Sequence, residues 1–267
     1  MTRVLSGAVL VAIAVGVVWF GPQWLLFLVA ETVVALAFVE YAHLAAACGL
    51  PIPRVAAGAS TMLGVVGVTS TRWIGDAIES NAVALDAVLM SAFVVLAATT
   101  LVAWRGGRDA LGRAAAAIFP VLYIGLPVGA LIAVRSRQAI FLLMLTVMVS
   151  DTAQYYSGRA FGRRLLAPAI SPKKTVEGAV GGFVFGTAVM AIVGAWWLPA
   201  LPAAVRVALG AAVVALGIAG DLFESMLKRS AGVKDSSALI PGHGGVLDRI
   251  DALLFAAPIY YLVLKYV

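Results

Sequence analysis

The sequence predicts an all-α fold, a polytopic integral membrane helical bundle of about nine transmembrane helices. Of its 267 residues, 63% are hydrophobic and only 12% are charged, which is far too apolar for a soluble globular chain. The mean hydropathy of +1.03 agrees. The chain also contains nine apolar runs that approach the length of about 20 residues that a helix needs to cross the ~30 Å hydrocarbon core. A single cysteine excludes a fold held by internal disulfides.

The nine apolar runs are expected to be helices, because every backbone N–H and C=O in a bilayer must be paired and the period-two alternation of a membrane barrel is absent. In chain order they cover residues 4–20, 24–46, 55–71, 82–103, 114–134, 139–158, 179–198, 203–224 and 247–266. The first run could instead be a cleavable signal peptide, but no small-residue cleavage site follows it, so we expect a span. With no long linker or repeat, residues 1–267 are expected to form a single transmembrane domain.

The basic residues indicate the orientation of the spans, because Lys and Arg accumulate on the cytoplasmic side. With nine spans and the N-terminus inside, most Lys and Arg residues fall on the cytoplasmic side. The exceptions are Arg72, Arg135, Arg137, Arg206 and Lys265. The two longest polar connections, residues 159–178 and 225–246, then face the cytoplasm, where nucleotides are found. The formal charge of +6 is therefore interpreted as a topology signal and a phosphate site, with no nucleic acid partner.

Carboxylates within the spans indicate function, because a charge near the bilayer centre costs at least ~2.5 kcal/mol. In this topology, acids of the sixth, eighth and ninth spans converge at one depth beneath the basic loops. Clustered carboxylates repel one another, and Mg²⁺, which prefers oxygen ligands, turns that repulsion into coordination. We therefore predict Mg²⁺ as the cofactor, and a second cation stays open. The predicted ligands are Asp151, Asp221, Asp248 and Asp251.

The segment from Ser225 to Asp251 combines these acids with donors for phosphate. Lys and Arg side chains pair with phosphate oxygens, and glycines let backbone N–H groups approach an anion closely. Upstream, Asp221, Glu224 and Lys228 follow helical spacing and share one face. The pattern favours a metal-bound polyphosphate. The alternative is that the acids form structural ion pairs with Lys228, Arg229 and Arg249.

The same segment resembles the signature of the phosphatidate cytidylyltransferases, also called CDP-diacylglycerol synthases. The matching positions are Ser225, Lys228-Arg229, Lys234-Asp235, Ser237, Ile240-Pro241, His243-Gly244-Gly245, Asp248-Arg249 and Asp251. Two upstream blocks are similar to the family as well: Asp151, Tyr155, Gly158, Arg159, Gly162 and Arg163, and then Ser171-Pro172, Lys174-Thr175 and Glu177-Gly178. The resemblance makes residues 145–267 the expected catalytic half.

The resemblance implies that CTP and phosphatidate react to give CDP-diacylglycerol and pyrophosphate at the cytoplasmic face of the inner membrane. The residues expected to carry the chemistry are Asp151, Asp221, Asp248, Lys228, Arg229 and His243. The expected substrate-binding residues are Ser171, Lys173, Lys174, Thr175, Ser225, Lys234, Asp235, Gly244, Gly245 and Arg249. Among these, Lys228, Arg229 and Lys234 are expected to clamp the CTP phosphates, and the block that begins at Ser171 to hold the lipid phosphate.

Several alternatives stay open. A related enzyme could use CTP with another lipid phosphate, and intramembrane acids also mark proton-coupled transporters. Gly182 and Gly186 could pack within the chain or form the seam of a homodimer. Glu40 and His43, on the second span, are expected to form interhelical hydrogen bonds and not to act as catalysts.

Overall fold

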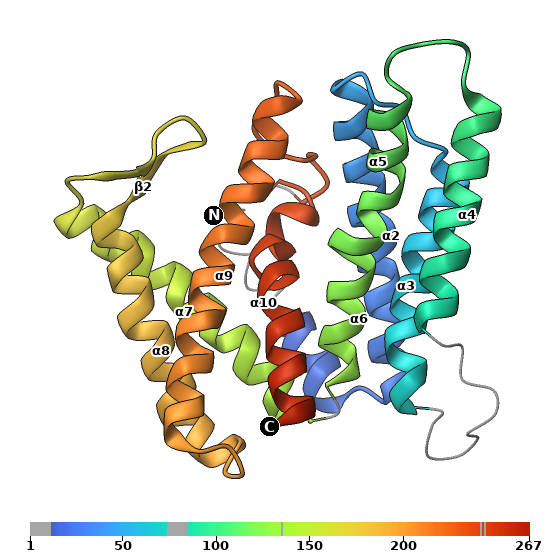
Figure 1. The fold of residues 1–267 in the computed structure, drawn as a ribbon. Coiled ribbons are helices and arrows are strands. Elements are labelled where there is room, and N and C mark those ends of the chain that lie inside the picture. Colours follow the sequence, from blue (N-terminus) through green and yellow to red (C-terminus); the bar gives the residue numbers. More distant parts are fainter. Residues whose placement is uncertain (1–11, 74–84, 135, 241, 243) are drawn as a thin grey trace. The chain divides into compact units, whose positions relative to one another are not determined.

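The computed structural model describes residues 12–73, 85–134, 136–240, 242 and 244–267 (Figure 1). Residues 12–20 are helical. The following helices are α2 (Gln23–Ala47), α3 (Arg54–Trp73), α4 (Leu85–Ala103), α5 (Ala110–Pro120), η1 (Val121–Gly125), α6 (Leu126–Ala133), α7 (Arg137–Phe161), α8 (Val176–Trp197), α9 (Ala203–Ser230) and α10 (Leu247–Tyr266). The predicted helical architecture is confirmed.

Within the described ranges, six helices are long and apolar enough to cross a membrane. They are α2, α4, the continuous helix Ala110–Ala133, α7, α8 and α9. Helices α3 and α10 lie where spans were predicted but are not among the six. The first part of the first predicted span, residues 4–11, lies outside the described residues. The chain thus has the composition of an integral membrane protein, and the predicted number of nine spans is not confirmed.

Cα packing divides the chain into two compact units, which are described separately. The first unit contains Met1–Ala133 and Ser230–Arg249, and the second contains Val134–Arg229 and Ile250–Val267. Both units therefore take residues from the predicted catalytic half.

The fifth predicted span is one helix with a wide turn in its middle. Pro120 has no N–H to donate, and the helix continues through the π-type turn η1 before α6. Glycines bring this helix against α3 in the first unit. A Cβ on Gly125 would meet the Thr61 carbonyl, and one on Gly129 would lie 3.0 Å from the Val65 Cα. The close approach of backbones therefore requires glycine at both positions.

Glycines also set the packing of α8 in the second unit. Gly178, Gly182, Gly186 and Gly194 are spaced on one buried face of this helix. A Cβ on Gly182 would lie 3.0 Å from the Ser150 hydroxyl of α7, and Gly186 lies against Ser150 and Val214. The Gly182-to-Gly186 pattern therefore serves packing within the chain, as predicted. The homodimer itself stays a prediction.

Two short strands depart from the predicted all-α fold. Within the polar connection 159–178, β1 (Leu165–Ala167) pairs antiparallel with β2 (Ser171–Thr175), in the register Leu165↔Thr175 and Ala167↔Ser171. Thr175 then caps α8, because its side-chain oxygen accepts from the Gly178 N–H at 3.1 Å. The predicted lipid-phosphate block therefore has a fixed backbone.

Candidate active site

An ion pair joins two segments that were predicted to bind different parts of the substrates. Lys174 Nζ of β2 lies 2.6 Å from Asp221 Oδ2 of α9, and both side chains keep some exposure, at 21% and 35%. The same carboxylate accepts a long hydrogen bond of 3.4 Å from the Ser225 hydroxyl through Oδ1. The second unit therefore brings one lysine of the basic hairpin directly onto a predicted metal ligand.

Glu177 holds the hairpin at its base. Its Oε2 accepts from the backbone N–H groups of Arg163 at 3.0 Å and Arg164 at 3.2 Å, and its Oε1 pairs with the Arg164 guanidinium at 3.2 Å. A carboxylate in the first turn of α8 also interacts favourably with the positive end of the helix dipole. These contacts fix the start of the connection close to its end, so the position of Lys174 is determined by more than its own ion pair.

The polar residues of α9 have the helical spacing that the sequence predicted. Lys228 makes an ion pair with Glu224 one turn away, and both side chains are almost fully buried, at 10% and 0% exposure. This pair is the structural alternative that was considered for Lys228. Because breaking a buried ion pair costs about 3–5 kcal/mol, Lys228 stabilises α9 whatever else it binds.

Two further predicted ligands belong to the second unit. Asp151 of α7 is exposed, and its Oδ1 accepts from the Gln154 side chain at 3.0 Å. Asp251 of α10 is half-buried, and its carboxylate interacts electrostatically with Asp221 and Asp151. Gly220 lets α9 approach this turn, because a Cβ there would press on the Asp251 carbonyl. Three of the four predicted metal ligands therefore belong to this unit.

Asp248, the fourth predicted ligand, organises the signature loop of the first unit. Its Oδ2 accepts from the Ser236 N–H at 2.9 Å and the Gly245 N–H at 2.7 Å, and lies 2.7 Å from the Ser236 hydroxyl, whose single hydrogen it shares with Glu40. Gly245 was predicted to offer its N–H to a phosphate, and in the structure that N–H is directed to Asp248. The sharing of one cation by Asp221 and Asp248 stays a prediction.

Glu40 was predicted to form interhelical hydrogen bonds, but its contact with the signature loop was not predicted. It lies on α2, is only 3% exposed, and accepts from the Ser236 and Ser237 hydroxyls and from the Val246 and Leu247 N–H groups, at 2.7–2.9 Å. Four donors offset the cost of burying a carboxylate, since a hydrogen bond to a charged group contributes about 1.5–3 kcal/mol. The predicted interhelical bonding of Glu40 is thus observed with the start of α10, while His43 is exposed and takes no part in these contacts.

The glycines of the loop are required by space and conformation. Gly244 has a φ of +78°, and a Cβ there would lie 2.6 Å from Asp248 Oδ2. At Gly245, a Cβ would collide with the Ser236 hydroxyl and the Glu40 carboxylate. Both glycines therefore serve the close packing of the loop against acidic side chains, in addition to any contact with substrate.

The remaining predicted residues differ in exposure. Ser171 is half-buried, and the exposed members are Lys173, Arg229, Lys234, Asp235 and Arg249. His243, the predicted phosphate donor, lies outside the described residues. Four of these exposed side chains, those of Lys173, Arg229, Lys234 and Arg249, are basic.

The predicted magnesium site can be tested against the donors that are present. Within the described residues, no three His, Cys, Asp or Glu side chains are grouped so that they could hold a metal ion. The chemistry of Asp151, Asp221 and Asp251 nevertheless suits Mg²⁺, because all three offer hard carboxylate oxygens. Lys174 now supplies the positive charge beside Asp221. The donor set fits the ion in chemistry, and its assembly into a site stays a prediction.

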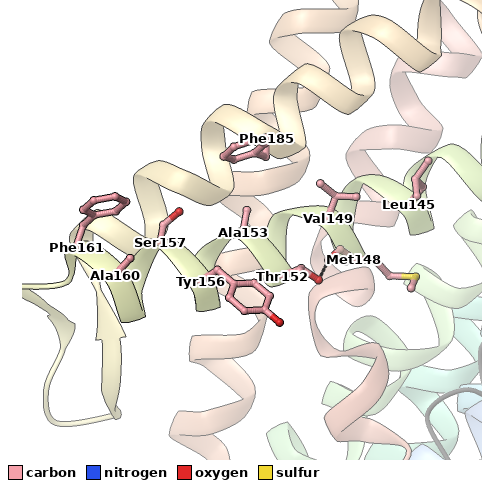
Figure 2. A pocket seen from close by; sticks show the side chains of 10 residues that line it. All are labelled: Leu145, Met148, Val149, Thr152, Ala153, Tyr156, Ser157, Ala160, Phe161 and Phe185. Atoms are coloured by element: carbon pink, nitrogen blue, oxygen red, sulfur yellow. Dashed lines mark hydrogen bonds between the residues drawn. The ribbon is translucent and has the colours of Figure 1, made fainter. Parts of the chain in front are cut away.

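An apolar groove runs along the second unit (Figure 2). It has a volume of about 610 Å³ and lies on α7, with Phe185 contributed by α8. Its wall includes Leu145, Met148, Val149, Tyr156 and Phe161, and none of its ten lining residues is charged. Two of its lining residues, Ser157 and Phe161, also line a smaller adjoining pocket that includes Arg164 and Glu177.

The chain is similar in sequence to known proteins. A model of the cytidylyltransferase family matches residues 1–267. The chain is 39% identical over 150 residues to the phosphatidate cytidylyltransferase of Aquifex aeolicus, covering 55% of each chain. It is 46% identical over 131 residues to that of Haemophilus influenzae, covering 46% of this chain and 45% of the relative. The alignments therefore span about half the length of these two relatives.

A longer alignment comes from a third relative. The chain is 30% identical over 225 residues to the phosphatidate cytidylyltransferase of Staphylococcus saprophyticus, covering 80% of each chain. The similarity therefore includes part of residues 1–133, outside the segments that carry the family motifs.

Proposed function

The chain belongs to the cytidylyltransferase family, and on this premise we propose that it transfers the cytidylyl group of CTP to phosphatidate, giving CDP-diacylglycerol and pyrophosphate. The names of the relatives support phosphatidate as the acceptor. The observation that carries the proposal is the Lys174–Asp221 pair, which joins a basic hairpin to an acidic helix in a chain of membrane-spanning composition. A site that brings two anionic substrates together needs basic side chains for the phosphates and acidic side chains for a cation.

Repulsion between the substrates is the first obstacle to this reaction. CTP carries close to about −4 and a lipid phosphate monoester about −1.5 to −2 at neutral pH. Lys173, Lys234, Arg229 and Arg249 are exposed cations on the segments that bear the family motifs. We propose that they bind the phosphates of the two substrates and so reduce the repulsion between them.

The Lys174–Asp221 pair is proposed to take part in substrate binding. An anionic phosphate near the hairpin can compete with Asp221 for the Lys174 ammonium group. The Asp221 carboxylate then becomes available to a cation. In this way, binding of the lipid phosphate at the hairpin controls whether Asp221 of α9 can bind a cation.

Magnesium is the proposed cofactor, held by Asp151, Asp221, Asp248 and Asp251, and a second cation stays open. When bound, Mg²⁺ would neutralise the nucleotide phosphates and stabilise the departing pyrophosphate. The phosphatidate oxygen forms a bond to the α-phosphorus of CTP while the bond between the α-phosphorus and the bridging oxygen breaks. No strong general base is required, because a phosphate monoester with a second pKa near ~6 is largely ionised at neutral pH.

The location of the reaction is proposed from the distribution of charge. We place the protein in the inner membrane with the hairpin and the signature loop at the cytoplasmic face, where CTP is present. A homodimer remains a proposal, and it would have to use a surface other than the Gly182 and Gly186 face.

The experiment that tests the function supplies purified protein with CTP, Mg²⁺ and a panel of lipid phosphates. Phosphatidate should yield CDP-diacylglycerol with an equal amount of pyrophosphate. Product with a different lipid phosphate alone would select a related CTP-dependent enzyme. The absence of a CDP-lipid with every acceptor would contradict the proposal and favour a transporter, to be tested by proton-coupled flux in liposomes.

A further inference from the structure

We propose that Glu40 is a positioning residue for this reaction: from α2 it holds both ends of the signature loop, residues 236–247, and thereby fixes the orientation of Asp248. The inference rests on the proposed function and adds a residue of the first unit to it. Glu40 was not predicted to contribute to the active site, and it lies far from the family signature in sequence.

The contacts of Glu40 join the start of the signature loop to its end. Oε1 accepts from the Ser237 hydroxyl at 2.7 Å and the Val246 N–H at 2.9 Å, and Oε2 accepts from the Ser236 hydroxyl at 2.9 Å and the Leu247 N–H at 2.8 Å. Each oxygen therefore joins a serine at the start of the loop to a backbone N–H at its end. One side chain closes the segment that contains the His243-Gly244-Gly245 motif.

The position of Glu40 also suits the start of α10. Val246 and Leu247 supply N–H groups at the N-terminus of this helix, where backbone donors lack partners within the helix. A carboxylate at this end is favoured by the helix dipole. Glu40 thus acts as a cap contributed by another helix, and the direction in which α10 begins depends on it.

The connection to Asp248 runs through one hydroxyl group. Ser236 Oγ lies 2.9 Å from Glu40 Oε2 and 2.7 Å from Asp248 Oδ2. Asp248 also accepts from the Gly245 N–H, and Gly245 is packed against the Glu40 carboxylate. The groups that orient Asp248 are therefore the groups that Glu40 holds. Loss of the Glu40 charge should misplace Asp248 without removing it.

A second buried acid on the same helix provides a matched control. Glu31 of α2 is 8% exposed, and among the described residues neither of its carboxyl oxygens has a hydrogen-bond partner. Glu31→Gln makes the same carboxyl-to-amide change in α2 but leaves every contact of the loop intact. A general effect of this change on the helix would thus appear in both variants, and a positioning effect only at Glu40.

The test compares Glu40→Gln with Glu31→Gln and the unchanged chain, in detergent or nanodiscs, using two readouts. One is kcat and KM for CTP in cytidylyl transfer to phosphatidate. The other is amide hydrogen exchange of residues 236–247, which requires no activity. Glu40→Gln should lower kcat at least 10-fold per folded molecule and speed exchange at Val246 and Leu247 at least 10-fold. Glu31→Gln should change neither by more than about 2-fold.

A milder variant keeps the test decisive if Glu40→Gln does not fold. Ser237→Ala removes one donor to Glu40 Oε1, and should lower kcat about 3-fold or more and speed loop exchange. Unchanged kcat in a folded Glu40 or Ser237 variant would overturn the positioning role, as would a fall in kcat without faster loop exchange. Absence of cytidylyl transfer by the unchanged chain would instead contradict the proposed function.

Discussion

Lys174 of β2 and Asp221 of α9 form an ion pair with a separation of 2.6 Å between Nζ and Oδ2. The sequence assigned these residues to different tasks, Lys174 to the lipid phosphate and Asp221 to a cation. Their contact means that neither group binds its ligand independently. A change at one residue should therefore alter the ligand dependence of the other.

Lys174→Met should lower kcat/KM for phosphatidate at least 10-fold and reduce the Mg²⁺ concentration needed for half-maximal activity. The first effect follows from the loss of a phosphate partner, and the second from the removal of the cation that competes at Asp221. Stability should change little, because a partly exposed ion pair contributes about 0–1 kcal/mol. Steady-state kinetics with varied Mg²⁺ measure both effects. Lys265→Met, near the C-terminus of α10, is the control, and an unchanged Mg²⁺ requirement in Lys174→Met would refute the coupling.

Lys228→Met should destabilise the protein and raise KM for CTP, and a double variant separates the two causes. Alone, the change leaves buried Glu224 without this counter-charge, at a cost of about 3–5 kcal/mol. Lys228→Met combined with Glu224→Gln should recover most of the thermal stability. If Lys228 also binds CTP, KM should stay raised about 10-fold in the double variant. Recovery of both stability and KM would show that Lys228 is only structural.

Asp221→Ala and Asp248→Ala should each abolish Mg²⁺-dependent turnover, to below about 1% of the unchanged chain, while membrane insertion is retained. The two variants should differ in the signature loop. Asp248→Ala removes the acceptor of two backbone N–H groups and should speed amide exchange at Ser236 and Gly245, whereas Asp221→Ala should not. Chelation of Mg²⁺ should abolish activity of the unchanged chain. Near-normal turnover in either variant would exclude that carboxylate from the cation site.

Gly245→Ala should disrupt the signature loop, because the added Cβ collides with the Ser236 hydroxyl and the Glu40 carboxylate. We expect at least a 10-fold loss of kcat and faster exchange of residues 236–247. Gly217→Ala of α9 is the matched control, since its Cβ would meet only the Ala252 Cβ, at an ordinary 3.7 Å. Wild-type turnover in Gly245→Ala would mean that the loop is not packed against Glu40 as described.

The sequence predicted the helices better than their polar ends. Hydropathy located the span 203–224, but α9 continues to Ser230, because ion pairing of Glu224 with Lys228 sustains a polar turn that a hydropathy scale scores as a loop. The β1–β2 hairpin could not be predicted from such short strands. Glu177 of α8 holds it by accepting from Arg163 and Arg164, which lie in the connection between α7 and β1.

The sequence predicted which residues belong to the candidate site better than it predicted the contacts between them. The acids of the second unit were identified because a charge within an apolar helix is costly. Gly245 was predicted to approach a substrate phosphate, which stays a prediction, and in the structure the carboxylates next to it are Glu40 and Asp248. The role of Glu40 could not be derived, because its partners lie at the other end of the chain and no local pattern specifies them.

The proposed cytidylyl transfer is tested most directly by following the phosphorus atoms of CTP. CTP labelled at the α-phosphorus should transfer its label to phosphatidate in the presence of Mg²⁺, and CTP labelled at the γ-phosphorus should release its label only as pyrophosphate. Label from the γ-phosphorus in the lipid, or no label in the lipid from either CTP, would contradict the account.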